Sequence, residues 1–199
     1  MNPRALEQVE QRLEKAGKAF ERLCETNDSD ETKEAWSDFL TASGTIYSKL
    51  LQGTKENGAS AGWFGRKKKE RKDDPLLRYV HHARNCDEHG IEDVTSTWTN
   101  HNFVGLGDGP FVGIHTPAGG NISNLVGVRH DGKRVPITTY ETKTVRLISV
   151  KDPKYHDTFD VPSSHLGEQL PATLQPAFVA GLALNYLKDL VEEARALVS

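Results

Sequence analysis

The sequence predicts an α+β protein with an N-terminal antiparallel helical bundle, an inserted and mostly antiparallel β-sheet, and a C-terminal helix that packs back on the bundle. Apolar residues recur every three or four positions in the first third of the chain and again near its end, which is the period of an amphipathic helix. Between these parts, glycine and β-branched residues dominate, as is typical of strands and turns. The expected domains are the bundle at 1–95, a small sheet region at 96–170, and the C-terminal helix at 171–199.

Two periodic runs predict the first two helices. The first extends from Leu6 to Leu23 and the second from Ala35 to Leu51, and they are separated by Asn27-Asp28-Ser29-Asp30. These polar side chains compete for backbone hydrogen bonds and favour helix caps. Helices joined by so short a turn are expected to pack antiparallel. The second helix is expected to end near Gly53.

The segment after the second helix is expected to be a flexible surface loop. Residues 53–65 are rich in glycine, serine, alanine and asparagine, a composition that favours flexible chain. A third helix is then predicted from Asp74 as N-cap and Pro75 at the first helical position. We expect it to end at Gly90 in a left-handed conformation.

Short runs of β-branched and aromatic residues predict the strands of the sheet. They are Phe103-Val104, Phe111–Ile114, Leu125–Val128 and Val145–Val150. Turns are expected at Asp108-Gly109-Pro110, Ala118–Asn121 and Asp131-Gly132. A last amphipathic helix follows from Val179 to Leu197. It is the natural fourth member of a four-helix bundle.

Composition bounds the class of protein without revealing its function. The chain has 199 residues, 25 basic and 28 acidic side chains, and a formal net charge of −3, so any attraction to nucleic acid must come from a local patch. Two cysteines, Cys24 and Cys86, are too few for a disulfide framework and fit a reducing compartment. The first residues lack a signal-peptide core, and no run approaches 18 apolar residues. We therefore expect a cytoplasmic protein.

One motif in the third predicted helix carries chemistry. Arg84 and Asn85 are followed by His89 after three further positions. This pattern resembles that of the HEPN family, helical-bundle domains many of which are ribonucleases in toxin–antitoxin and phage-defence systems. The resemblance covers the helical part of the chain and says nothing about the sheet. It implies a metal-independent endoribonuclease without a cofactor, with a possible antitoxin as protein partner.

The residue types suit that reaction. Histidine titrates near neutral pH and moves protons, whereas arginine presents a permanently charged planar fork to phosphate oxygens. Residues five apart on a helix are separated by about 140°, so Arg84 and His89 do not share one face. In the family, two protomers place both motifs in one cleft, which implies a homodimer. The resemblance gives Asn85 the role of orienting this pair or of binding phosphate. The opposing interpretation is structural: Arg84 pairs with Glu88 one turn on.

The only dense cationic run precedes this helix. Aromatic rings beside lysines are able to stack bases while the ammonium groups hold phosphates. The candidate RNA-binding residues are Trp63, Lys67, Lys68, Lys69, Arg71 and Lys72. The alternative is an ordinary solvated charged loop.

Two further alternatives stay open. His82, Cys86 and His89 share a helix face and have donor types that suit zinc, although the paired spacing of common zinc motifs is missing. The protein is alternatively a non-enzymatic dimeric interaction or ligand-binding protein, in which the helix with Arg84 and His89 is structural and the sheet presents a surface to another protein or a ligand.

Overall fold

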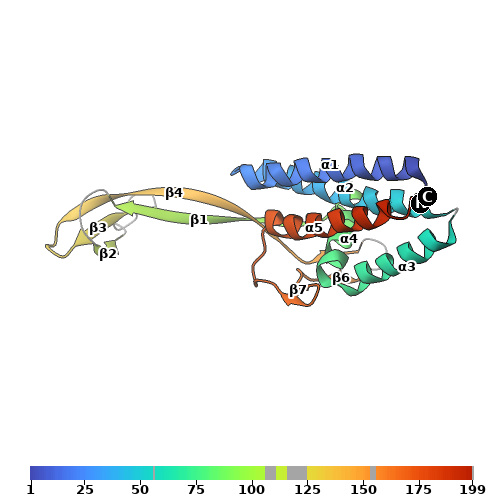
Figure 1. Ribbon diagram of the computed structural model, residues 1–199. Helices are drawn as coiled ribbons and strands as arrows, with labels where there is room; N and C mark the ends of the chain where they lie inside the picture. Colours follow the sequence, from blue (N-terminus) through green and yellow to red (C-terminus); the bar gives the residue numbers. More distant parts are fainter. Residues whose placement is uncertain (56, 106–110, 116–124, 153–155, 199) are drawn as a thin grey trace. The chain divides into compact units, whose positions relative to one another are not determined.

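A computed structural model describes residues 1–55, 57–105, 111–115, 125–152 and 156–198. The helices are α1 (Pro3–Glu25), α2 (Ser29–Thr54), α3 (Gly58–Asp73), α4 (Pro75–His89) and α5 (Pro176–Arg195). Contacts divide the chain into a helical unit, Met1–Ser96 with Val145–Ser199, and a sheet unit, Thr97–Thr144. The predicted α+β class is confirmed, because α1 packs on α2 and the C-terminal helix α5 packs back on α1 (Figure 1).

The break between α1 and α2 falls in the predicted polar segment. At the end of α1, the backbone N–H of Thr26 donates to the carbonyl oxygen of Arg22 at 3.0 Å. At the start of α2, the Asp28 carboxylate accepts from the backbone N–H groups of Asp30 and Glu31, both at 2.9 Å. The segment therefore satisfies orphan backbone groups of both helices, which fixes where one ends and the next begins.

The core lies between the helices of the helical unit. The predicted apolar faces supply it, and burial of each large side chain contributes roughly 1.5–3 kcal/mol. Side chains with no exposed surface are Val9, Ala16, Ala35, Trp36, Phe39, Leu40, Ile46, Leu50, Leu76, Ala83, Val179, Ala180 and Ala194.

The expected flexible loop at 53–65 is wrong for most of its length, because Gly58 begins α3. Asn57 caps this helix by accepting from the backbone N–H of Ser60 at 3.0 Å. Trp63 and Phe64 are buried against the bundle. Packing of these two aromatic rings offsets the poor helix propensity of the neighbouring glycines. The cationic run therefore belongs to a helix rather than to a loop.

Asp74 and Pro75 begin α4 as predicted, but the end of this helix differs. Gly90 has φ −92°, so it does not adopt the expected left-handed conformation. Its backbone N–H donates to the carbonyl oxygen of Cys86 at 2.7 Å. A Cβ atom at residue 90 would lie 2.5 Å from that oxygen. Glycine is needed here for close approach of two backbone segments, not for positive φ.

The main sheet has four strands in the order β1-β4-β3-β2. They are β1 (Thr95–Gly105), β2 (Phe111–His115), β3 (Val126–Arg129) and β4 (Arg134–Leu147). The pairs β2–β3 and β3–β4 are antiparallel. The predicted turn at Asp131-Gly132 joins β3 to β4, and Gly132 takes φ +76°. The turns expected at 108–110 and 118–121 lie outside the described residues.

Two short strand pairs belong to the helical unit. They are β5 (Val150–Lys151) with β6 (Thr158–Phe159), and β7 (Ser164–His165) with β8 (Glu168–Gln169). Both strand pairs contact α4, the first through β5 and the second through β7. The chain from Val145 onward, which the sequence assigns to the sheet region as far as residue 170, therefore belongs to the helical unit.

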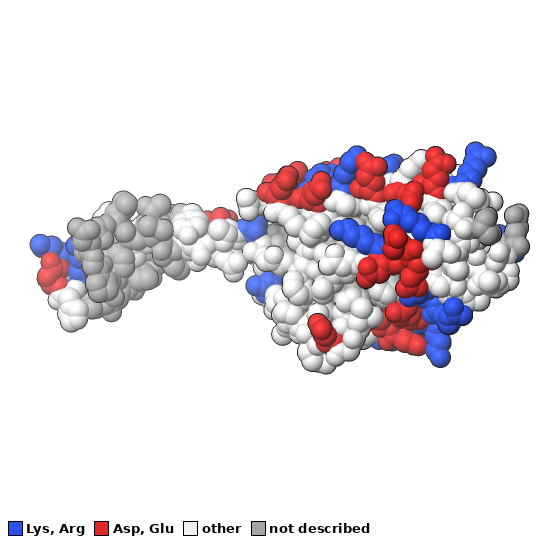
Figure 2. All heavy atoms as spheres, viewed as in Figure 1, with Lys and Arg blue, Asp and Glu red and all other residues white. Residues whose placement is uncertain are grey.

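Charge is mixed on the face of the helical unit that Figure 2 shows, where acidic and basic side chains lie interspersed. Within the described ranges, no helix combines the length and the apolar character needed to cross a bilayer.

Candidate active site

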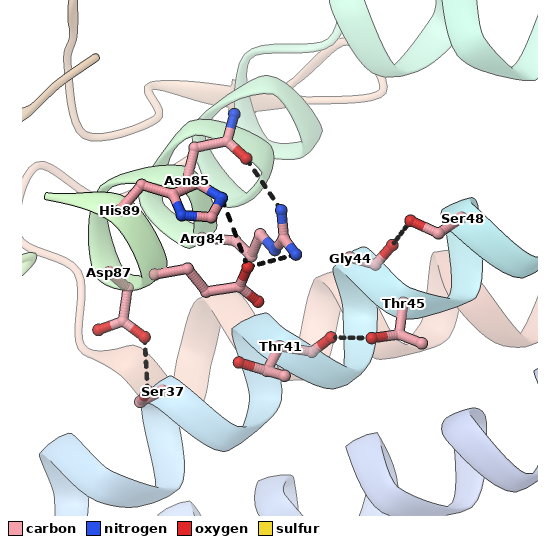
Figure 3. Close-up of polar contacts among 10 residues, drawn as sticks. Ser37, Thr41, Gly44, Thr45, Ser48, Arg84, Asn85, Asp87 and His89 are labelled. Atoms are coloured by element: carbon pink, nitrogen blue, oxygen red, sulfur yellow. Dashed lines mark hydrogen bonds and ion pairs between the residues drawn. The ribbon is translucent and has the colours of Figure 1, made fainter. Parts of the chain in front are cut away.

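The last two turns of α4 bring Arg84, Asn85 and His89 together (Figure 3). Glu88 is the link, because its carboxylate forms an ion pair with the Arg84 guanidinium and lies 3.8 Å from Nε2 of His89. On the other side, Nη1 of Arg84 donates to Oδ1 of Asn85 at 3.3 Å. The 140° separation of Arg84 and His89 is thus bridged within one helix by a third side chain.

The two catalytic candidates differ in exposure. The His89 side chain is 65% exposed, whereas that of Arg84 is 26% exposed. Among the described residues, the Glu88 carboxylate is the only polar partner found for the His89 ring. The imidazole is therefore accessible to a ligand, and the guanidinium beside it is held in place by Glu88 and Asn85.

Helix α2 packs against the Arg84 side chain at Gly44. A Cβ atom at Gly44 would lie 2.9 Å from Nε of Arg84 and 3.1 Å from its Cδ, so only glycine leaves room for the arginine stem. Ser37 Oγ donates to Oδ2 of Asp87 and ties α2 to the same turns of α4. A helical glycine that faces another helix has no signal in a single sequence, and Gly44 was not predicted.

The candidate RNA-binding residues fall into two groups. Trp63 is 6% exposed, and its ring N–H donates to Glu193 at 2.8 Å, so its ring is not accessible for stacking on a base. Lys67 pairs with the same Glu193 carboxylate at 2.7 Å and with Glu70 at 3.3 Å. Burial of Glu193 opposes these contacts, but the hydrogen bonds from Lys67 and Trp63 lower its pKa overall.

The other cations of the run differ again. Lys68, Lys69 and Lys72 are exposed, so their ammonium groups are free to meet phosphates. Arg71 is half-buried, with its guanidinium carbon 4.3 Å from the centre of the Tyr47 ring. The exposed lysines therefore remain candidates for RNA binding, whereas Arg71 belongs to the interior of the bundle.

The three residues considered for zinc point to different partners. Nδ1 of His82 lies 3.4 Å from Asp152, and its ring stacks on Phe159. The Cys86 thiol donates to the carbonyl oxygen of Lys151 at 2.9 Å, and burial raises its pKa. Burial also lowers the pKa of His82. No group of three or more metal-binding side chains occurs in the described part of the chain.

One buried polar pair was missed by sequence reasoning. Oδ1 of the Asp74 carboxylate lies 3.1 Å from Nδ1 of His165, 91 residues further along the chain. The same carboxylate accepts from the backbone N–H groups of Leu77 at 2.8 Å and Leu166 at 2.7 Å. The helix cap predicted at Asp74 thus also anchors the β7–β8 hairpin to α4, a long-range contact that local spacing does not reveal.

Comparisons with models of known protein families, with curated proteins and with solved structures found no match to this chain.

Proposed function

We propose that this protein is a metal-independent endoribonuclease with a HEPN-like active site built on Arg84 and His89. The observation that carries this proposal is the shared contact with Glu88, which holds a guanidinium beside an exposed imidazole at the end of α4. Cleavage of a phosphodiester needs both groups. A cation stabilises the negative charge that develops on the phosphate, and a second group moves protons near neutral pH.

In the proposed reaction, the ribose 2′-hydroxyl attacks the adjacent phosphorus. A bond forms between O2′ and phosphorus while the bond to O5′ breaks, which leaves a 2′,3′-cyclic phosphate and a 5′-hydroxyl. His89 takes the 2′-hydroxyl proton, and Arg84 binds the non-bridging oxygens, on which negative charge accumulates. Asn85 and Glu88 keep the guanidinium oriented.

The geometry of the displacement favours a homodimer for this chemistry. The attacking O2′ and the leaving O5′ lie on opposite sides of phosphorus, so a proton is taken on one side and given on the other, and among the described residues each chain brings a single exposed imidazole to this cluster. A second copy of the chain, packed so that its motif faces the first, supplies the second imidazole. Molar mass in solution, measured by light scattering, tests this part of the proposal.

A second candidate is a non-catalytic interaction protein. One observation favours it: Glu88 already neutralises Arg84, as expected of a structural i, i+4 pair. Under this alternative, changing Arg84 and His89 to alanine together leaves the protein's effect in cells unchanged. Under the ribonuclease proposal, inducing the wild-type protein slows growth, as expected of a toxin or phage-defence component, and the double variant relieves the effect.

The chemistry of the products tests the ribonuclease directly. Purified protein is incubated with single-stranded and structured RNAs in EDTA between about pH 6 and pH 8, the range in which histidine exchanges protons. The expected products carry 2′,3′-cyclic phosphate and 5′-hydroxyl ends. Intact RNA at high protein concentration, or cleavage that EDTA abolishes, contradicts the proposal.

A further inference from the structure

Strands β1 and β4 are neighbours in the sheet (Figure 1) and present two exposed aromatic side chains. Trp98 of β1 is 53% exposed, and Tyr140 of β4 is 50% exposed. The other two tryptophans of the chain, Trp36 and Trp63, are buried in the helical unit. Large aromatic side chains supply most of their stabilisation when they are buried, so two exposed rings on adjacent strands indicate a binding surface if they share a face.

The two rings do share a face. Successive side chains of a strand point to opposite faces, so Trp98 and Asn102 lie on one side of β1, and Tyr140 and Thr142 lie on one side of β4. Nδ2 of Asn102 donates to Oγ1 of Thr142 at 2.9 Å, which makes these two sides the same face of the sheet. Ile137, on the opposite side of β4 by the same alternation, is 6% exposed. The aromatic face, as we call it, comprises Trp98, Asn100, Asn102, Tyr140 and Thr142.

The charges around the aromatic face favour an anionic ligand. Glu141, the acidic residue of β4, lies on the opposite face, where its carboxylate is 3.3 Å from Nδ1 of His101. Arg134 is exposed, and alternation places it on the same side of β4 as Tyr140. Residues 97–144 contain four basic and three acidic side chains, a formal charge of +1, although the whole chain has −3. A polyanion is therefore attracted to this part of the protein more than to the rest.

Polar side chains lie among the two rings. Asn100 is exposed and Asn102 is half-exposed, and both have amide groups that are able to meet polar atoms of a ligand. The core of a protein–protein interface is more apolar than this. An unpaired base suits the face better, because it offers a flat surface for stacking together with a polar edge for hydrogen bonds.

We propose that the aromatic face binds unpaired bases of single-stranded RNA, with Trp98 and Tyr140 each stacking on a base and Arg134 contacting phosphate. The inference rests on the proposed ribonuclease function and names its substrate class. Bases of an RNA duplex already stack on one another inside the helix and are closed to a flat protein surface, so duplex RNA is a poor ligand. Every base has a π-face, and binding therefore depends on strandedness more than on sequence.

Binding to a full-length His89→Ala protein tests this proposal without cleavage. The probe is a ten-nucleotide single-stranded RNA, and affinity is measured by fluorescence anisotropy at low salt. Trp98→Leu and Tyr140→Leu keep an apolar side chain but remove the ring, and each is expected to weaken binding about fivefold or more. His101→Gln changes the opposite face of β1 and is expected to alter affinity less than twofold. The same is expected of Phe178→Leu, which removes a 46% exposed ring from α5.

Tryptophan fluorescence provides a second measurement that leaves the aromatic face unchanged. Trp36 and Trp63 are 0% and 6% exposed, so Trp98 is the tryptophan that a base is able to reach. Single-stranded RNA is expected to quench the fluorescence of the His89→Ala protein, and to have no such effect once Trp98→Leu is added. A ribose-phosphate strand of the same length without bases is expected to bind more weakly and to leave the fluorescence unchanged.

Three outcomes overturn the proposal. The first is equal affinity of the Trp98→Leu, Tyr140→Leu and His101→Gln proteins, each with an unfolding temperature close to that of the parent. The second is a strand without bases, or an RNA duplex, that binds as tightly as single-stranded RNA. The third is a lower molar mass of the Trp98→Leu protein by light scattering, since the face would then join copies of this chain.

Failure of this proposal is distinguishable from failure of the proposed function. RNA that binds through Trp98 but is never cut by the wild-type protein refutes the nuclease and leaves the aromatic face. Cleavage of single-stranded RNA that is as fast with both Trp98→Leu and Tyr140→Leu as without them refutes the aromatic face and leaves the nuclease.

Discussion

Arg84 on α4 lies directly against Gly44 on α2, so that a Cβ atom at residue 44 would be 2.9 Å from the arginine Nε. The contact involves the middle of the side chain, where the atoms have little freedom to move aside. The position of the guanidinium therefore depends on the absence of a side chain at residue 44. This relationship links the packing of two helices to the proposed chemistry.

Gly44→Ala is expected to reduce RNA cleavage by about tenfold or more, because small displacements of a positioned group have large effects on rate. The free energy of unfolding is expected to change by less than about 1 kcal/mol, since the higher helix propensity of alanine offsets the tight contact. Gly17→Ala on α1 is the matched control, because no heavy atom lies within 4 Å of its Cβ position. It should stabilise the protein by about 0.5–1 kcal/mol and leave cleavage unchanged. Equal rates of RNA cleavage for both variants would show that the reaction does not depend on the position of Arg84.

His81 predicts a pH dependence of stability. Its pKa is about 4 in the folded protein, against 6.5 for an ordinary histidine. The unfolded chain binds this proton first, so the free energy of unfolding falls as the pH drops from about 6.5 to 4. With allowance for solvent screening of the half-exposed ring, the contribution is about 1–2 kcal/mol. Urea unfolding near pH 7 and pH 5 is expected to show a smaller loss for His81→Gln than for wild type. An identical loss in both proteins would mean that His81 is readily protonated in the folded state.

Asp74→Ala is expected to destabilise the protein by about 2–4 kcal/mol. The substitution removes the α4 cap and leaves two backbone N–H groups and the His165 ring without their acceptor, and buried hydrogen bonds to a charged group are among the strongest in proteins. The neighbouring Asp73 is exposed, so Asp73→Ala provides the control, with an effect below about 0.5 kcal/mol. Chemical unfolding measures both. A small effect of Asp74→Ala would show that the β7–β8 hairpin does not depend on this carboxylate.

The exposed lysines of α3 predict a salt dependence of RNA binding. Changing Lys68, Lys69 and Lys72 to glutamine is expected to lower the slope of log affinity against log salt by up to about 2, at roughly 0.7 per phosphate contact with single strands. The same change at Lys15, Lys33 and Lys188, exposed on other helices, should leave the slope as it is. If both triple variants behave alike, the cationic run is an ordinary solvated helix face.

Sequence periodicity was sufficient for most of the helical unit. The apolar faces of α1, α2 and α5 were predicted because they repeat over many turns. The cap at Asp74 and the capping segment 27–30, in which Asp28 is the cap, were predicted because their chemistry is local. Helix α3 was missed because its stability comes from burial of Trp63 and Phe64 in the bundle, which a local composition rich in glycine conceals. Long-range packing decides such segments.

The candidate site was predictable in its residues and not in its surroundings. The spacing of Arg84, Asn85 and His89 is visible in the sequence, whereas Gly44 comes from another helix. Its contribution depends on how α2 packs against α4, which a single sequence does not specify. The same holds for His165, whose partner lies 91 positions away.

The cleavage rate of the His89→Ala protein in EDTA tests the central claim most directly, with His130→Ala as its control because His130 is an exposed histidine of the sheet unit. General acid–base catalysis by a histidine contributes about 10²–10⁴-fold to a rate. We therefore predict that His89→Ala lowers RNA cleavage at least about 100-fold, while His130→Ala cuts RNA as fast as wild type. Cleavage by the His89→Ala protein at the wild-type rate would contradict the assignment of the active site.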